Sequence, residues 1–202
     1  MRHDATSFHR AYRDEARVLV PRDRISARVA ELADAIAACY RGREVTILAV
    51  LTGAVIFLAD LMRQLPLAMR IELVSVSSYP GTATASQGVN FRTQLPDLTG
   101  KDVLIVDDIL DTGRTIAALI RAVRDAGADS VRTCVLLRKL FAKGSAEASG
   151  GDGRGAPDFV GFDIDDEFVV GYGLDFDNLY RNLPDLCVLD RHRRAVNGED
   201  RP

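Results

Sequence analysis

An apolar run that ends in two adjacent carboxylates is the feature of this chain that most constrains its fold. Residues 103–106 are Val, Leu, Ile and Val, and Asp107 and Asp108 follow directly. A run of this kind is typical of a strand buried on both faces of a parallel sheet. Ligands of parallel sheets bind beyond the carboxyl ends of the strands. The two acids are therefore expected at the edge of the sheet where an α/β protein binds its ligand.

A turn and then a helix follow the two acids. The turn contains Asp111 and then Thr112, Gly113, Arg114 and Thr115. Apolar residues at positions 116, 119, 120 and 123 have the spacing of one helical face, and Gly127 stands where a helix C-terminal glycine is expected. We therefore expect the turn to present backbone N–H groups and hydroxyls at a helix N-terminus, which is a favourable anion site. Gly113 lets the backbone approach the anion closely.

The carboxylates have two interpretations. In the first, Asp107, Asp108 and Asp111 are solvated loop acids, and Asp111 caps the following helix. In the second, the adjacent acids point to opposite sides of the strand end. There they accept hydrogen bonds from sugar hydroxyls and help to hold a divalent cation such as Mg²⁺, which takes oxygen ligands, few of them from protein. The apolar strand, the third acid and the turn together favour the second interpretation.

Composition places the chain among ordinary globular proteins. Its 202 residues are most simply one domain, and a net charge of −3 gives no reason to expect bulk affinity for nucleic acid. No apolar run reaches the ~18 to 20 residues that span a bilayer, and the N-terminus is charged rather than signal-like. Cys39, Cys134 and Cys187 are widely spaced among apolar neighbours, which is typical of small buried hydrophobes in a reduced, cytoplasmic protein.

Helices and strands are expected to alternate along most of the chain. Apolar periodicity predicts helices over about residues 24–39, 55–64 and 115–126, and strands over 45–50, 70–77, 103–106, 131–137 and 168–174. Residues 1–17 are expected to be irregular or weakly helical, 79–90 a long flexible loop, and the glycine-rich stretch 144–157 mobile. This alternation predicts a parallel α/β sheet with right-handed crossovers.

The segment 103–115 resembles the phosphoribosyl-pyrophosphate motif of the type I phosphoribosyltransferases. Matches elsewhere, from about Val18 to about Leu189, narrow the resemblance to the hypoxanthine-guanine phosphoribosyltransferases. The resemblance implies a single phosphoribosyltransferase domain over residues 1–202. Its mainly parallel twisted sheet is flanked by helices in a core of about 22–140. A small hood is built largely from about 141–202, with the N-terminal residues.

The resemblance also implies an activity. It is the Mg²⁺-dependent transfer of a phosphoribosyl group from phosphoribosyl pyrophosphate to hypoxanthine or guanine, giving IMP or GMP and pyrophosphate. The family forms dimers and tetramers, so a homodimer or homotetramer is expected, with no nucleic-acid or membrane partner. Two alternatives stay open. One is a regulatory protein that senses phosphoribosyl pyrophosphate, and the other is a phosphoribosyltransferase for another base such as xanthine.

By resemblance, the opening motif binds the ribose phosphate. The 5-phosphate is held by Thr112, Gly113, Arg114 and Thr115. Asp107 and Asp108 hold the ribose hydroxyls and, with Asp175, the metal. Asp111 is the implied general base, which takes a proton from N7 of the purine as N9 attacks.

The pyrophosphate is assigned by resemblance to a second loop. Leu51, Thr52 and Gly53 bind it through backbone amides, and Arg181 pairs with its oxygens. The family commonly has a cis peptide bond between the residues that match Leu51 and Thr52, so we expect one here. Many members have Lys where this chain has Thr52, which is why Thr52 is expected to act through its backbone.

The purine and the closing loop complete the implied site. Lys139 donates to the 6-oxo group, Phe168 stacks on the ring, Val169 offers its backbone to the base edge, and Asp175 lies in the same C-terminal signature. Ser78 and Tyr79 belong to the flexible loop that closes over the site. Arg138 stands where the family often has Asp.

Overall fold

The computed structural model describes residues 16–78, 89–91, 95–140 and 156–189. These residues form two compact units. The larger unit lies within residues 28–166, and the smaller combines the described residues before 28 with those from 167 onward. None of the described helices is both long enough and apolar enough to cross a bilayer.

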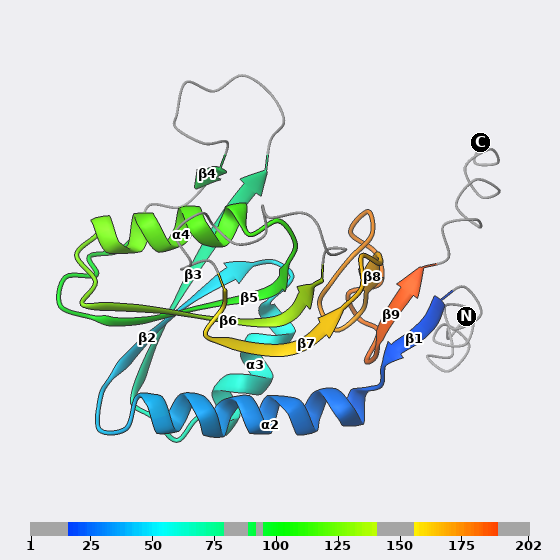
Figure 1. Cartoon of the computed structure of the whole chain (residues 1–202), viewed down its shortest axis with the longest axis horizontal. Coiled ribbons are helices and arrows are strands. Elements are labelled where there is room, and N and C mark those ends of the chain that lie inside the picture. Colours follow the sequence, from blue (N-terminus) through cyan, green and yellow to red (C-terminus); the bar gives the residue numbers. More distant parts are fainter. Residues whose placement is uncertain (1–15, 79–88, 92–94, 141–155, 190–202) are drawn as a thin grey trace, which may run out of the picture. The chain divides into compact units, whose positions relative to one another are not determined.

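A six-stranded sheet forms the centre of the larger unit (Figure 1). Its five parallel strands lie in the order β3 (Met69–Ser78), β2 (Val45–Leu51), β5 (Asp102–Leu110), β6 (Ser130–Lys139) and β7 (Phe159–Ile164). A short strand, β4 (Val89–Phe91), pairs antiparallel with β3 at one edge. The predicted parallel α/β sheet is confirmed.

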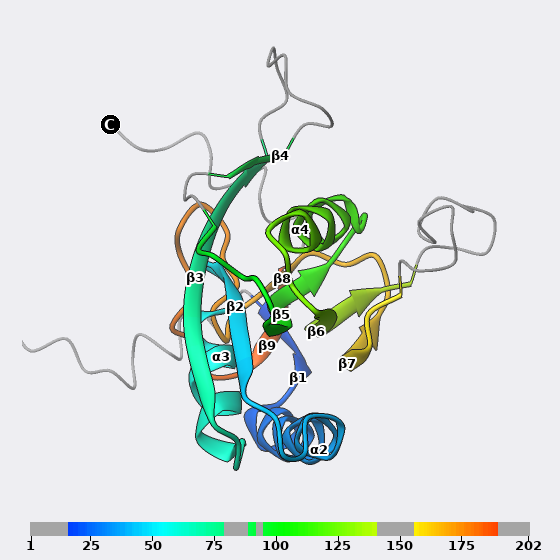
Figure 2. The same cartoon turned by 90° about the vertical axis from the view of Figure 1, so that its left-hand side faces the viewer.

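Helices cover both faces of this sheet. The long helix α2 (Arg22–Cys39) precedes β2, α3 (Val55–Gln64) follows β2, and α4 (Arg114–Asp125) follows β5. In both orientations α3 and α4 lie on opposite faces of the sheet (Figure 1 and Figure 2). Buried strand residues therefore need to be apolar on both sides, which is why residues 103–106 show no alternation with polar residues.

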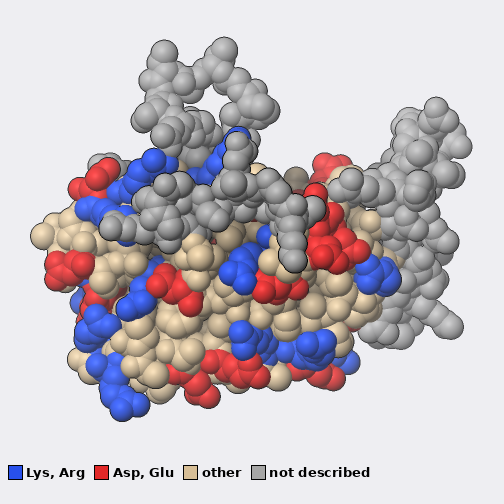
Figure 3. Space-filling model, in the orientation of Figure 1, with Lys and Arg blue, Asp and Glu red and all other residues tan. Residues whose placement is uncertain are grey.

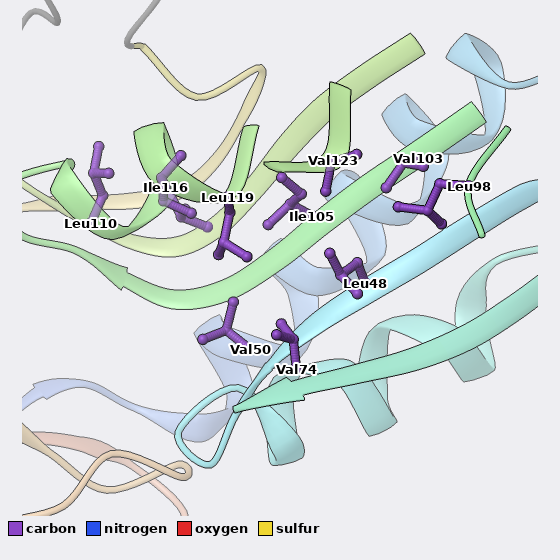
Figure 4. Packing of buried hydrophobic residues seen from close by; sticks show 11 residues of the cluster. Leu48, Val50, Val74, Leu98, Val103, Ile105, Leu110, Ile116, Leu119 and Val123 are labelled. Atoms are coloured by element: carbon purple, nitrogen blue, oxygen red, sulfur yellow. The ribbon is translucent and has the colours of Figure 1, made fainter. Parts of the chain in front are cut away.

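One hydrophobic core of the larger unit lies between α4 and the sheet. Ile116, Leu119 and Val123 project from α4 toward Val103 and Ile105 of β5 (Figure 4). Each of these five side chains is at most 3% exposed. The predicted apolar face of the helix is therefore confirmed. Ile120, the fourth residue of that pattern, is partly buried against the same cluster.

The order of the strands creates a switch point in the sheet. The chain passes from β2 to β3 on one side and later returns to place β5 on the other side of β2. The connection after β2 therefore leads toward one edge of the sheet, and the connection after β5 leads toward the other edge. Ligands of open α/β sheets bind where two such connections diverge. This topology positions the site described below.

The smaller unit contains a three-stranded antiparallel sheet. Its strands β1 (Ala16–Val20), β9 (Leu186–Leu189) and β8 (Val169–Val170) pair in that order. Asp185 is buried, and its Oδ1 accepts a hydrogen bond of 2.8 Å from the backbone amide of Arg22, the first residue of α2. Amides in a first helical turn have no acceptor within the helix, so Asp185 supplies one from a distant part of the sequence.

Several predicted elements need correction. The strand predicted over 168–174 is wrong beyond Val170, because Gly171, Tyr172 and Gly173 have φ of 90°, 49° and 102°, which a strand cannot accommodate. The sequence did not predict strands β1, β4, β7 and β9. The loop predicted over residues 79–90 is wrong at its end, because Val89 and Asn90 belong to β4. Because β7 pairs with β6, residues 159–164 add a strand to this sheet.

The central motif also differs in its bounds. Strand β5 continues through Leu110, so Asp107 and Asp108 lie within the strand. Helix α4 begins at Arg114, so Arg114 and Thr115 are its first two residues rather than part of the turn. Gly127 has φ of 88° directly after the helix end, as predicted. The predictions for residues 1–15, 79–88 and 141–155 lie outside the described residues.

Candidate active site

Two neighbouring acids define the carboxyl end of β5. Side chains alternate between the two faces of a strand. Asp107 therefore lies on the same face as residues 103 and 105, which α4 covers, and Asp108 lies on the other face with residues 104 and 106. Asp107 is 6% exposed, and its Oδ1 accepts a hydrogen bond of 2.9 Å from the Asp108 amide. Burial, together with the neighbouring Asp108 carboxylate, raises the pKa of Asp107 well above its usual value. A ligand that brings positive charge or hydroxyl donors would favour the charged form.

The loop after β2 contacts the end of β5. Gly53 lies so close to Asp108 that a Cβ on residue 53 would be 1.6 Å from the Asp108 Oδ2. The carboxylate of Asp108 therefore occupies the space that any other residue at position 53 would need. The peptide bond between Leu51 and Thr52 is cis, which confirms that expectation, and Thr52 is exposed. The loop after β2 and the end of β5, about 55 residues apart in the sequence, thus form one surface.

A turn with one left-handed residue leads from β5 into α4. Gly113 is the residue before the helix and has φ of 74°, a conformation that glycine adopts without the steric penalty of a side chain. No side chain caps this helix end, so the interpretation of Asp111 as a helix cap is wrong. The first amides of a helix have no intrahelical acceptor and attract anions. Thr112, Gly113, Arg114 and Thr115 are placed at this end, as the 5-phosphate assignment requires.

The end of β6 brings Lys139 to the same edge of the sheet. Its Nζ lies 3.6 Å from Oδ1 of Asp111 and 2.8 Å from Oδ1 of Asp166. Arg138, the residue that departs from the family pattern, forms a bidentate pair with Asp163 at 2.6 and 2.9 Å. Sequence reasoning missed Asp163 and Asp166 because the strand that carries them to this edge, β7, was not predicted.

The smaller unit contains several of the residues assigned to the site, and these contact other residues of the same unit. Arg181 pairs with Asp175 at 2.7 Å and donates to the Gly173 carbonyl at 2.8 Å. The ring of Phe168 makes an edge-to-face contact with Phe176, with centroids 5.6 Å apart and an interplanar angle of 87°. Val169, the other assigned residue of this segment, is buried in β8. Ser78 is the last residue of β3, and Tyr79 lies outside the described residues.

The donor set at β5 fits a hard divalent cation. Carboxylate oxygens of Asp107 and Asp108 are ligands that Mg²⁺ prefers, and a cation would relieve the burial and mutual repulsion that raise the pKa of Asp107. Within the described ranges, no three His, Cys, Asp or Glu side chains gather as a metal cluster. With these two carboxylates as protein ligands, the ion would take its remaining ligands from substrate and water.

The chain is similar to known proteins along most of its length. Residues 21–177 match a family model described as the phosphoribosyl transferase domain. A hypoxanthine-guanine phosphoribosyltransferase from Mycobacterium avium is 41% identical over 181 residues, which cover 86% of this chain and 85% of that protein. The corresponding protein of Bacillus subtilis is 35% identical over 87% of this chain and 94% of its own. A crystal structure of a hypoxanthine phosphoribosyltransferase from Staphylococcus aureus has a TM-score of 0.78 at 30% identity, covering 91% of this chain and 96% of that one.

Proposed function

The chain belongs to the phosphoribosyltransferase family, and on that premise we propose that it is a purine salvage enzyme. It transfers the 5-phosphoribosyl group from phosphoribosyl pyrophosphate to hypoxanthine or guanine, giving IMP or GMP and pyrophosphate. The observation that carries the proposal is the contact between Gly53 and Asp108, which joins the loop after β2 to the acidic end of β5 at the switch point of the sheet.

The sugar phosphate binds at the start of α4. The amides and hydroxyls of Thr112, Gly113 and Thr115 surround the 5-phosphate, and Arg114 adds positive charge. Asp107 and Asp108 accept hydrogen bonds from the ribose hydroxyls. Binding there adds hydroxyl donors to the single backbone amide of Asp108 from which Asp107 now accepts, which supports this assignment.

The pyrophosphate binds to the backbone of Leu51, Thr52 and Gly53. Mg²⁺ held by Asp107 and Asp108 supplies charge neutralisation for the leaving pyrophosphate. Arg181 binds pyrophosphate oxygens and Asp175 a second Mg²⁺. In the present structure these two side chains neutralise each other at 2.7 Å, so each exchanges its partner when substrate binds.

The base is recognised by its 6-oxo group and its ring face. Lys139 donates to the 6-oxo oxygen, Phe168 stacks on the ring, and Val169 offers its backbone to the base edge. Asp111 takes the proton from N7 as N9 attacks the sugar. Its position 3.6 Å from the Lys139 ammonium and its 55% exposure support this role, because the carboxylate is accessible and lies near the proposed base-binding group.

Turnover with defined substrates tests the proposal. Purified protein is mixed with phosphoribosyl pyrophosphate, Mg²⁺ and each of hypoxanthine, guanine, xanthine and adenine, and the nucleotide and pyrophosphate formed are measured. We expect turnover with hypoxanthine or guanine that requires both the base and Mg²⁺. Turnover with xanthine or adenine alone would instead assign the enzyme to another base. No turnover with any base would contradict the proposal.

The competing regulatory function receives less support from the charge distribution. On the face that Figure 3 shows, basic and acidic side chains are interspersed over the described residues rather than gathered into one basic patch. Nucleic-acid binding depends mainly on such basic surfaces. Retention of RNA on a filter at low salt, abolished by phosphoribosyl pyrophosphate, would favour the regulatory function.

The compartment and the assembly follow from the same proposal. We assign the enzyme to the cytoplasm, because Cys134 and Cys187 are buried, as expected of small hydrophobes in a reduced protein. We assign it a homodimer or homotetramer, which exposed apolar residues on α3, namely Val55, Ile56 and Met62, support. Light scattering on the purified protein measures the assembly directly.

A further inference from the structure

We propose that Asp166 is a positioning residue that orients Lys139 toward the 6-oxo group of the purine. The inference rests on the proposed function, in which Lys139 binds that group. It concerns a residue to which neither the sequence motifs nor the resemblance gives a role.

The contacts of Lys139 carry this inference. Its ammonium forms a 2.8 Å ion pair with Asp166, which is within hydrogen-bond distance, whereas Asp111 at 3.6 Å is beyond it. The lysine side chain is 13% exposed, but those of Asp111 and Asp166 are 55% and 65% exposed. A largely buried lysine stem thus ends between two accessible acids, and the nearer one determines where the ammonium points.

The pairing of β6 with β7 holds Asp166 in place. Lys139 and Ile164 are register partners, and the amide of Leu140 donates to the Ile164 carbonyl at 2.7 Å. On the preceding rung the guanidinium of Arg138 forms its bidentate pair with Asp163. Asp166 follows Ile164 by two residues, so it leaves a strand end whose register is fixed by two kinds of contact.

The chemistry of an ammonium group explains why one acid is needed beside it. An ammonium has three donors and rotates freely on a flexible stem. Asp166 takes one donor and leaves the others for a carbonyl oxygen of the base. Without Asp166, the nearest carboxylate is Asp111, and a pair between Lys139 and Asp111 would occupy both the base-binding group and the proposed general base.

Steady-state kinetics with matched variants test this role. We expect Asp166→Asn to raise KM for hypoxanthine about tenfold, the effect of losing one charged hydrogen bond, while KM for phosphoribosyl pyrophosphate stays within about twofold. Asp165→Asn is the control, because the side chain of Asp165 is exposed and has no partner among the described residues. Asp166→Glu keeps the carboxylate and is expected to recover most of the affinity for the base.

A double-mutant cycle shows whether Asp166 acts through Lys139. In a Lys139→Met background, Asp166→Asn is expected to have no further effect on KM for hypoxanthine. Equal KM values for Asp166→Asn and Asp165→Asn, or fully additive effects in the cycle, would overturn the inference. If Asp166→Asn fails to fold, Asp166→Ser provides the same comparison. A parent enzyme without turnover would contradict the proposed function itself, whereas an active parent with an unchanged Asp166→Asn variant contradicts only this inference.

Discussion

The two ends of strand β5 carry acids in opposite electrostatic situations. At the amino end, Asp102 accepts two hydrogen bonds from Arg43 at 2.9 and 3.1 Å and one from the hydroxyl of Ser130. At the carboxyl end, Asp107 is buried beside Asp108, with no ion pair to Asp107 among the described residues. One strand thus carries two kinds of acid. Asp102 is paired with a basic side chain, whereas Asp107 is buried beside a second acid.

The difference separates an acid that the fold pairs with a base from an acid that the fold buries beside a second carboxylate. Pairing Asp102 with Arg43 stabilises the fold and leaves little charge for binding. Burial beside another carboxylate raises the pKa of Asp107, so its charged form lowers the stability of the ligand-free fold, and a ligand that supplied cations or hydroxyl donors would recover that free energy on binding. The comparison can be tested by removing the charge at either end, or by moving the groups around it.

The largest expected effect is at Asp111, just beyond the carboxyl end. Asp111→Asn removes the proposed proton acceptor but keeps the size of the side chain. We expect kcat to fall by about 10² to 10⁴ while KM for phosphoribosyl pyrophosphate changes less than about twofold. Asp125→Asn, at the exposed far end of α4, is the matched control. Undiminished kcat would remove Asp111 from the mechanism.

Gly53→Ala is expected to have the next largest effect. The new Cβ would meet the Asp108 carboxylate, which is the free end of a side chain and can rotate away. We therefore expect the fold to persist and KM for phosphoribosyl pyrophosphate to rise about tenfold, the value of one lost charged hydrogen bond. In Gly42→Ala, where φ is 76° and no atom lies within 4 Å, we expect lower stability with unchanged KM. The idea of a shared surface fails if both variants change KM equally.

Asp107→Asn is expected to stabilise the ligand-free protein. Below the unfolded pKa of about 4, the carboxyl group is protonated in both states and costs nothing. As the pH rises, the unfolded state ionises first because the pKa of folded Asp107 is raised, so the parent loses stability until the pH reaches that folded pKa. The asparagine variant has no such loss.

Thermal melts at several pH values measure this difference. We expect the variant to have the higher Tm at pH 7 and a smaller advantage at pH 5. In a chain of this size, each kcal/mol of added stability raises Tm by about 2–4 °C. Saturating phosphoribosyl pyrophosphate with Mg²⁺ should reverse the order, because the variant binds it less tightly. A lower Tm for the ligand-free variant at pH 7 would show that the charge of Asp107 is compensated within the fold.

The smallest expected effect is at the amino end of β5. Asp102→Asn weakens a partly exposed ion pair, so we expect a loss of about 1 kcal/mol in the free energy of unfolding. Denaturant titration measures this loss. kcat and both KM values should remain those of the parent, since Asp102 lies at the opposite end of the strand from the site. A fall in kcat in a folded variant would break the contrast between the two ends.

Elements with strong local patterns could be predicted from the sequence. The helix at 55–64 was predicted with its observed bounds, and the strands at 45–50 and 103–106 were found but end later than predicted. The core face of α4 and the role of Gly127 were also confirmed. In these segments, burial on one side or both sides leaves a periodic record in the chain itself.

Strands without such a record were missed. β7 and β9 are short, and β1 reads as part of a polar N-terminal stretch. Each forms because a partner far away in the sequence offers its backbone, as β9 does for β1. The strand prediction for residues 171–174 is wrong for the opposite reason. Their apolar composition is typical of a strand and gives no sign of the positive φ values at which β8 ends.

The sequence by itself determined the acids, the glycine turn and the helix that follows, because these residues are neighbours along the chain. Only the tertiary structure decided that Gly53 contacts Asp108 and that Asp166 lies beside Lys139. Those contacts depend on which strands pair and in what register, and pairing is a long-range choice made by burial of the whole sheet. Residue types therefore indicated the chemistry, and the fold decided which groups meet to perform it.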